Sequence, residues 1–172
     1  GIDPRKISAI HLGIHKQDYV WNNGNLEKHE EKLVLFLGRV TLQKGPEYFL
    51  RAAKLALQFD PDLKFIMAGE GDHLPKMLHL SASLGISDKV FFTGFLNEKE
   101  AKEVYQMADL FVMTSVAEPF GLVALEAVRS GVPCILPKNA GISEILSHSI
   151  KVDFWDVNEL ANSIVSILKY PV

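Results

Sequence analysis

The sequence predicts an α/β fold, a Rossmann-like parallel sheet of about six strands with helices on both faces. The chain has 172 residues, of which 48% are hydrophobic and 23% charged, as in an ordinary globular domain. From residue 33 onward, short apolar stretches alternate with longer stretches of helical character. The apolar stretches are continuous, which is typical of parallel strands buried on both faces, and right-handed crossovers then favour the doubly wound strand order.

Each predicted strand is a short apolar run, and each predicted helix fills the interval before the next strand. The first strand, Leu33–Leu37, is apolar throughout, and the helix after it carries Phe49 and Ala53 on one face. The last helix begins near Asp156 and Glu159, which have the spacing of a capping box. The predicted strands are residues 33–37, 64–68, 90–93, 110–114, 133–136 and 151–154. The predicted helices are residues 47–58, 74–84, 98–107, 122–130, 142–147 and 156–169.

Residues 1–32 do not show this alternation. We interpret residues 1–4, which contain Gly, Asp and Pro without periodicity, as a tag remnant. The remainder of residues 1–32 contains short apolar runs followed by loop-forming and charged residues, which is typical of a segment connecting two domains. Residues 33–172 are the predicted Rossmann-like domain.

Charge and cysteine content narrow the classes of function. The net charge is −3 and no dense basic tract is present, so the electrostatic footprint of a nucleic-acid-binding protein is missing. The single cysteine, Cys134, forms no internal disulfide, which favours a reducing compartment, and we expect a cytoplasmic location. The most apolar central stretch, residues 107–117, is short and contains Asp109, so neither a membrane span nor a signal peptide is expected.

The loop after the first strand contains two cations where a ligand is expected. In doubly wound sheets the ligand crevice lies beyond the carboxyl ends of the strands at which the strand order reverses, here the first and fourth. Arg39 and Lys44 lie in this loop, next to Gly38 and Gly45. A guanidinium pairs with phosphate oxygens and an ammonium adds a point charge, so both suit a diphosphate. The alternative is that both are solvated surface cations.

The loop after the fourth strand contains Glu118, Pro119, Phe120 and Gly121. Gly121 opens the next predicted helix, whose free amide groups and positive dipole end attract anions. A glycine at this position also has a purely conformational explanation. The carboxylate of Glu118 faces either a sugar or water.

Glu126 lies in a predicted helix that is apolar nearly all round, a pattern typical of a buried helix. A buried carboxylate needs a cation or hydrogen-bond donors, and the two hydroxyls of a ribose are neutral donors placed side by side. The alternative is a structural bond to Arg129 or to a backbone amide.

Glu118 and Glu126 lie eight residues apart, and this pair resembles the paired-glutamate signature of the large family of retaining glycosyltransferases called group 1. That family has the GT-B fold, which is built from two Rossmann-like domains. The sequence around Arg39 and Lys44 is similar to the family's phosphate loop. Further matches are residues 68–71, 92–95 and 130–133. The resemblance extends from about residue 7 to the C-terminus.

This resemblance implies the C-terminal, nucleotide-sugar-binding domain of an enzyme that transfers a hexosyl group from a nucleoside-diphosphate sugar to an acceptor. Glu118 is the implied catalytic residue, in contact with the hydroxyls of the transferred sugar. The implied donor-binding residues are Arg39 and Lys44 on the diphosphate, Glu126 on the ribose, and the backbone of Phe120, Gly121 and Leu122. The implied base-contacting residues are Thr93, Gly94, Phe95 and Leu96.

The same resemblance implies the partners of the chain. No cofactor and no metal are expected, because the nucleotide sugar is a substrate. The N-terminal domain of the same polypeptide, which would hold the acceptor, is the implied partner, and the chain alone is expected to be inactive. Two residues depart from the family pattern: Ala140, where a glycine is common before Gly141, and Leu12, where an Asn-Gly pair is more usual.

Other chemistries fit the residues less well. Gly69 and Gly71 lack the third glycine of a dinucleotide fingerprint. His73 and His79 lack a third clustered metal ligand, and Cys134 lies in an apolar strand that favours packing. The alternative functions are a nucleotide-sugar epimerase or phosphorylase of similar fold, and a noncatalytic module that binds a nucleotide or a protein.

Overall fold

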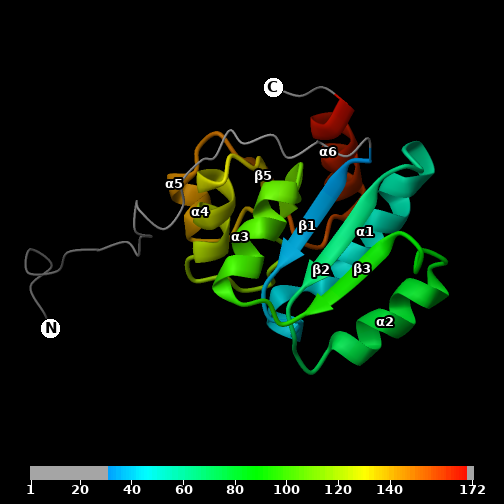
Figure 1. Ribbon diagram of the computed structural model, residues 1–172. Coiled ribbons are helices and arrows are strands. Elements are labelled where there is room, and N and C mark those ends of the chain that lie inside the picture. Colours follow the sequence, from blue (N-terminus) through cyan, green and yellow to red (C-terminus); the bar gives the residue numbers. More distant parts are fainter. Residues whose placement is uncertain (1–30, 170–172) are drawn as a thin grey trace, which may run out of the picture.

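The computed structural model describes residues 31–169, whose centre is a sheet of six parallel strands (Figure 1). The strands are β1 (Leu33–Leu37), β2 (Lys64–Ala68), β3 (Val90–Gly94), β4 (Leu110–Val112), β5 (Cys134–Pro137) and β6 (Ile150–Val152). They lie in the order β3-β2-β1-β4-β5-β6, so the order reverses between β1 and β4. The predicted doubly wound fold is confirmed. The predicted connecting segment lies outside the described residues except for Glu31 and Lys32.

Within residues 31–169, six α-helices and one short 3-10 helix connect or follow the strands. They are the 3-10 helix η2 (Leu42–Lys44) and the α-helices α1 (Pro46–Phe59), α2 (Leu74–Ser83), α3 (Glu98–Met107), α4 (Leu122–Arg129), α5 (Ile142–Ile145) and α6 (Val157–Lys169). The carboxylate of Asp156 accepts a hydrogen bond from the amide of Glu159 at 3.0 Å, as the capping spacing predicts. None of the helices between residues 31 and 169 combines the length and apolar character needed to cross a membrane.

The helices form one layer on each face of the sheet (Figure 1). Buried side chains of α1, α2 and α6 pack in one apolar cluster with Val34 and Phe36 of β1. Buried side chains of α3, α4 and α5 pack in a second cluster with Leu35, which points to the opposite face of the same strand. Both faces of β1 are therefore covered, which explains why its sequence is apolar without alternation.

The fourth strand is shorter than its predicted extent of residues 110–114. It ends at Val112, and the hydroxyl of Thr114 lies 3.2 and 2.9 Å from the carbonyl oxygens of Lys44 and Gly45, to either of which it can donate. Met113 and Thr114 are buried although they lie beyond the strand. Thr114 is buried because its loop packs against the loop after β1, and burial alone therefore made the predicted strand too long. This early end of β4 brings the loop after it against the loop after β1.

Candidate functional site

The two loops that the sequence singled out meet at the carboxyl ends of β1 and β4. The amide of Val116 donates to the carbonyl oxygen of Gln43 at 2.9 Å, and the side-chain amide of Gln43 donates to the carbonyl oxygen of Ala117 at 3.0 Å. These bonds join the loop of residues 38–45 to the loop of residues 113–121. The joined loops lie where the strand order reverses, the position at which doubly wound folds bind ligands.

Gly45 allows the close approach of these loops. Its backbone is left-handed, with φ at +60°, and it caps η2 and precedes α1. A Cβ atom at this position would lie 2.2 Å from the carbonyl oxygen of Thr114, a separation that no side chain tolerates. A glycine is therefore required both by the backbone angle and by the close approach of the loop that contains Thr114. This contact places Lys44 at the junction of the two loops.

Lys44 and Glu118 form an ion pair across the junction of the two loops. The ammonium of Lys44 contacts Oε2 of Glu118, and the hydroxyl of Ser115 donates to the same oxygen at 3.2 Å. The side chain of Glu118 is 8% exposed and that of Lys44 is 21% exposed. The structure thus brings together the predicted diphosphate-binding lysine and the predicted sugar-contacting carboxylate. Ser115 is a partner that the sequence analysis did not assign.

Arg39 is exposed, and its guanidinium has no hydrogen-bond or ion-pair partner within residues 31–169. The backbone beside it is anchored, because the amide of Val40 donates to the carbonyl oxygen of Glu70 at 2.8 Å and its own carbonyl oxygen accepts from the amide of His73. A Cβ on Gly71 would lie 2.2 Å from that carbonyl oxygen. The glycines after β2 therefore serve this close contact between loops. The guanidinium of Arg39 is left available to a ligand.

The start of α4 is braced by the turn before α5. Gly121 precedes α4 with φ at +106°, and the carbonyl oxygen of Phe120 accepts from the amide of Ile142 at 2.8 Å. A Cβ on Gly141 would lie 2.2 Å from the carbonyl oxygen of Pro119, which explains the glycine that follows Ala140. The amide groups of the first turn of α4 begin at Leu122, four residues after Glu118. This end of α4 offers hydrogen-bond donors and a positive dipole.

Glu126 is not enclosed in the way that the sequence predicted. Only Ala124 and Ala127 of α4 are buried, whereas Leu122 and Val128 are 37% and 44% exposed. The prediction of burial all round the helix is wrong, because α4 covers the sheet on one side only. The Glu126 carboxylate is partly exposed, and its Oε2 accepts a hydrogen bond from the hydroxyl of Tyr105 on α3 at 3.1 Å.

The four predicted base-contacting residues lie at the end of β3, the edge strand of the sheet. The carbonyl oxygen of Gly94 accepts from the amide of Gly69 at 2.9 Å, so this strand end is tied to the loop after β2. Thr93 and Phe95 are exposed, Phe95 to 71%, and Leu96 is half-buried. These residues share the carboxyl edge of the sheet with Arg39 and Lys44, separated from β1 by β2.

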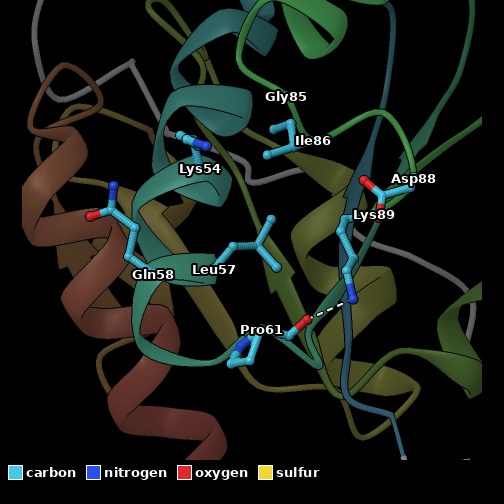
Figure 2. A pocket seen from close by; sticks show the side chains of 8 residues that line it. All are labelled: Lys54, Leu57, Gln58, Pro61, Gly85, Ile86, Asp88 and Lys89. Atoms are coloured by element: carbon cyan, nitrogen blue, oxygen red, sulfur yellow. Dashed lines mark hydrogen bonds between the residues drawn. The ribbon is translucent and has the colours of Figure 1, made fainter.

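A pocket of about 200 Å³ lies at the opposite end of the sheet (Figure 2). It is lined by residues from the C-terminal half of α1 and from the turns before β2 and β3. Figure 2 shows the ammonium of Lys89 directed at the carbonyl oxygen of Pro61, to which it donates at 2.7 Å. This pocket includes none of the residues of the two joined loops. Within residues 31–169, no three metal-ligating side chains are grouped closely enough to hold a metal ion.

The fold and these loops define a doubly wound α/β domain that carries the charged residues Lys44 and Glu118 at its topological switch point. The chain belongs to the family of glycosyl transferases group 1, whose model matches residues 20–171. The predicted family membership is confirmed.

Individual relatives agree with this assignment. The chain is 37% identical over 155 residues to an uncharacterized glycosyltransferase of Methanocaldococcus jannaschii, covering 84% of this chain and 40% of that protein. It resembles the structure of Anabaena HepE in complex with UDP-glucose, with 25% identity, a TM-score of 0.75, and coverage of 84% of this chain and 41% of that one.

The fold also matches a structure of one domain. The crystal structure of the C-terminal domain of a glycosyl transferase group 1 family protein, LpcC from Francisella tularensis, has a TM-score of 0.80 at 23% identity. The match covers 92% of this chain and 89% of that one. By contrast, the chain spans 34–42% of the length of three curated relatives.

Proposed function

We propose that this chain is the donor-binding domain of a retaining glycosyltransferase that transfers a hexosyl group from a nucleoside-diphosphate sugar to an acceptor. The observation that carries the proposal is the junction of the two loops, where Lys44 and Glu118 meet beside the first turn of α4. A diphosphate needs cations and a sugar needs hydrogen-bond acceptors. The crevice has both within one group of contacts. The UDP-glucose complex of HepE supports a donor of this class.

In this proposal the diphosphate lies between Arg39, Lys44 and the start of α4. Arg39 is exposed and available to pair with phosphate oxygens, and the amide groups that follow Gly121 add donors at a positive dipole end. Phe120, Gly121 and Leu122 contribute through their backbone. These groups neutralise a diphosphate with protein charges, so we propose that binding requires no metal ion or other cofactor.

The ribose and the nucleobase of the sugar nucleotide are assigned to residues on either side of the diphosphate site. Glu126 accepts hydrogen bonds from the ribose hydroxyls, and its partly exposed side chain is accessible to them. The nucleobase lies along the end of β3. The residues assigned to it are Thr93, Gly94, Phe95 and Leu96.

Glu118 is the proposed catalytic residue because it would contact the sugar that is transferred. In the reaction, the bond from the sugar's anomeric carbon to the diphosphate oxygen breaks and a bond to the acceptor oxygen forms on the same face. The acceptor hydroxyl gives its proton to the departing diphosphate oxygen. The electron pair leaves with the diphosphate, whose developing charge is stabilised by Arg39 and Lys44. Glu118 holds the sugar hydroxyls in position while this bond breaks. The acceptor site belongs, in this proposal, to an N-terminal domain of the same polypeptide.

Calorimetry with UDP in the presence of a chelator tests the proposal, with ADP and GDP as further probes. We expect the 172-residue chain to bind one of these nucleotides, and Arg39→Ala with Lys44→Ala to weaken binding by at least about 100-fold, as expected for loss of two phosphate contacts. The matched control is Arg51→Ala with Lys54→Ala, which removes the same residue types from the body of α1. Binding that appears only with magnesium, or that survives the loop substitutions, contradicts the proposal.

A further inference from the structure

We infer that the ion pair between Lys44 and Glu118 makes the crevice select an intact nucleotide sugar over the free nucleoside diphosphate. This inference rests on the proposed function, since it assigns Lys44 to the diphosphate and Glu118 to the sugar. It adds a preference between two ligands, which neither the diphosphate-binding role of Lys44 nor the sugar-binding role of Glu118 implies by itself. The two ligand-binding groups are each other's partners when no ligand is bound, so a ligand competes with their pairing.

Breaking the ion pair affects the two side chains differently, because Glu118 is more buried than Lys44. Lys44 and Ser115 both contact Oε2 of Glu118, and no hydrogen bond or ion pair within residues 31–169 involves its Oε1. The Glu118 side chain is 8% exposed, so little water replaces a lost partner. Lys44 is more exposed, at 21%, and its long side chain is able to turn toward a phosphate.

The backbone of Glu118 is held in place and does not follow the lysine. The carbonyl oxygen of Glu118 accepts a hydrogen bond from the amide of Gly141 at 3.2 Å. The carbonyl oxygen of Pro119 also packs against Gly141, so closely that a Cβ atom there would lie 2.2 Å from it. Ser115 follows directly on the buried Thr114 and is itself 1% exposed. When Lys44 turns to a phosphate, Glu118 stays where it is with the Ser115 hydroxyl as its remaining donor.

A buried carboxylate that loses its cation is destabilised unless new donors reach it. A nucleoside diphosphate takes Lys44 and supplies no such donor. A nucleotide sugar takes Lys44 and brings sugar hydroxyls to Oε1, so the lost ion pair is offset. The ion pair therefore lowers affinity for the free diphosphate more than for the donor. After transfer, the same effect favours release of the diphosphate product.

Ser115 is a positioning residue in this arrangement. Its hydroxyl keeps Oε2 occupied after the lysine has left and so leaves Oε1 directed to the sugar. Removing this hydroxyl should harm binding of the free diphosphate more than binding of the sugar nucleotide, because the diphosphate complex has no other donor to Glu118.

A double-mutant cycle with UDP and UDP-glucose tests the inference, provided that the chain binds UDP in the first place. Glu118→Gln removes the charge at nearly constant shape, and we expect it to tighten UDP binding by about five- to thirtyfold. In a Lys44→Met background the same substitution should change UDP affinity by less than about twofold, because no ion pair remains to be broken. The ratio of the UDP dissociation constant to that of UDP-glucose should fall in Glu118→Gln.

Two further variants separate the ion pair from general electrostatics. Glu70→Gln removes an exposed carboxylate from the adjacent loop, and UDP affinity should stay within about twofold. Ser115→Ala should act in the opposite direction to Glu118→Gln and weaken UDP binding by about three- to tenfold, with a smaller effect on UDP-glucose. Ser115→Ala also gives an independent result if Glu118→Gln folds poorly.

The outcomes distinguish this inference from the proposed function. If UDP binds in an Arg39- and Lys44-dependent way but Glu118→Gln leaves its affinity unchanged, the inference is wrong and the proposed function stands. A gain in UDP affinity that persists in the Lys44→Met background is a general field effect and also overturns the inference. If the parent chain binds none of UDP, ADP and GDP, the proposed function fails and the inference fails with it.

Discussion

The hydroxyl of Tyr105 lies 3.1 Å from Oε2 of Glu126 and 3.0 Å from the carbonyl oxygen of Val123. A hydroxyl has one proton, so Tyr105 donates to one of these two acceptors at a time. The contact joins α3 to α4 and orients the Glu126 carboxylate. It also leaves that carboxylate with capacity to accept hydrogen bonds from a ligand.

Replacing the ribose of the nucleotide tests the role of Glu126. If Glu126 accepts hydrogen bonds from both ribose hydroxyls, a 2′-deoxy nucleotide should bind worse by about 1–3 kcal/mol, because part of the carboxylate loses its donor. Glu126→Gln should shrink this difference. Calorimetry with UDP and 2′-deoxy-UDP gives both values. Equal affinity of the parent chain for the two ligands would return Glu126 to a purely structural role with Tyr105.

Tyr105→Phe tests the structural side of the same contact. The side chain of Tyr105 is fully buried, and loss of its hydroxyl leaves acceptors without a donor. We expect the free energy of unfolding to fall by about 1–2 kcal/mol. Tyr48→Phe is the matched control, since Tyr48 is half-buried and its hydroxyl has no partner within residues 31–169. Urea denaturation of both variants decides the matter, and equal losses would contradict the assignment.

Much of the fold was predictable because buried strands and helices have characteristic patterns of apolar residues in the sequence. Three predicted elements have the observed bounds, namely β1, β2 and α3. Each is bounded by a clear change of composition, and α3 begins with a full capping box between Asn97 and Glu100. The strand order was also predictable, since right-handed crossovers leave few arrangements for alternating strands and helices.

The details of the site were less predictable because they depend on contacts between distant residues. Glu126 was assigned to a buried helix from its apolar neighbours, but those neighbours cannot show which side of α4 meets the sheet. Tyr105 lies 21 residues before Glu126, and Lys44 lies 74 residues before Glu118. Ser115 was not assigned from the sequence, because its hydrogen bond to Glu118 depends on how the loop folds.

Gly45→Ala should disturb both stability and ligand binding. Its Cβ would lie 2.2 Å from the Thr114 carbonyl oxygen, and the backbone at this position is left-handed. We expect the free energy of unfolding to fall by about 2–4 kcal/mol and UDP binding to weaken, because the adjacent Lys44 moves.

The matched control for this glycine is Gly85→Ala. Gly85 has φ at +66°, close to that of Gly45, but nothing lies within 4 Å of an added Cβ. It should therefore cost only the backbone strain of about 1 kcal/mol and leave UDP binding unchanged. If the two substitutions cost the same, the close contact with Thr114 has no energetic role.

Cys134 should make stability fall at alkaline pH. Burial raises the pKa of its thiol to about 12, whereas the unfolded thiol has a pKa of about 8.5. The folded state thus keeps the proton that the unfolded state releases. The stabilisation is fully present below pH 8.5 and is lost as the pH rises toward 12. At pH 10 the loss amounts to about 2 kcal/mol relative to pH 7.

Urea denaturation at pH 7.5 and pH 10 checks this sign. Tyrosines and lysines also titrate in this range, but they do so equally in Cys134→Ala. We therefore expect a smaller alkaline loss in Cys134→Ala than in the parent chain. The native thiol should also react slowly with a thiol reagent until the protein unfolds, since the thiolate is the reactive form. If both proteins lose the same free energy of unfolding between pH 7.5 and pH 10, the ionisation of Cys134 does not differ between the folded and unfolded states in this range.

We expect the 172-residue chain to bind a nucleotide sugar without transferring the sugar. Transfer requires donor and acceptor to be held together in attack geometry. The described residues provide groups for a donor, and the chain spans only 34–42% of the length of three curated relatives. In a longer parent polypeptide, Glu118→Ala should lower kcat by at least about 100-fold, as expected when a group that acts at the reacting sugar is removed.

The comparison that decides this uses the donor found by calorimetry and measures transfer by the chain, by the longer parent and by the parent with Glu118→Ala. Nucleotide affinity should be kept or increased in that variant, because in the proposed arrangement Glu118 contacts the sugar and competes with the diphosphate for Lys44. Glu70→Ala in the parent should leave kcat unchanged, since Glu70 is exposed on the adjacent loop. Sugar transfer by the 172-residue chain alone would contradict the need for a second domain. A parent that binds the donor and transfers nothing would favour a noncatalytic nucleotide-binding module, and unimpaired turnover in Glu118→Ala would remove that carboxylate from the reaction.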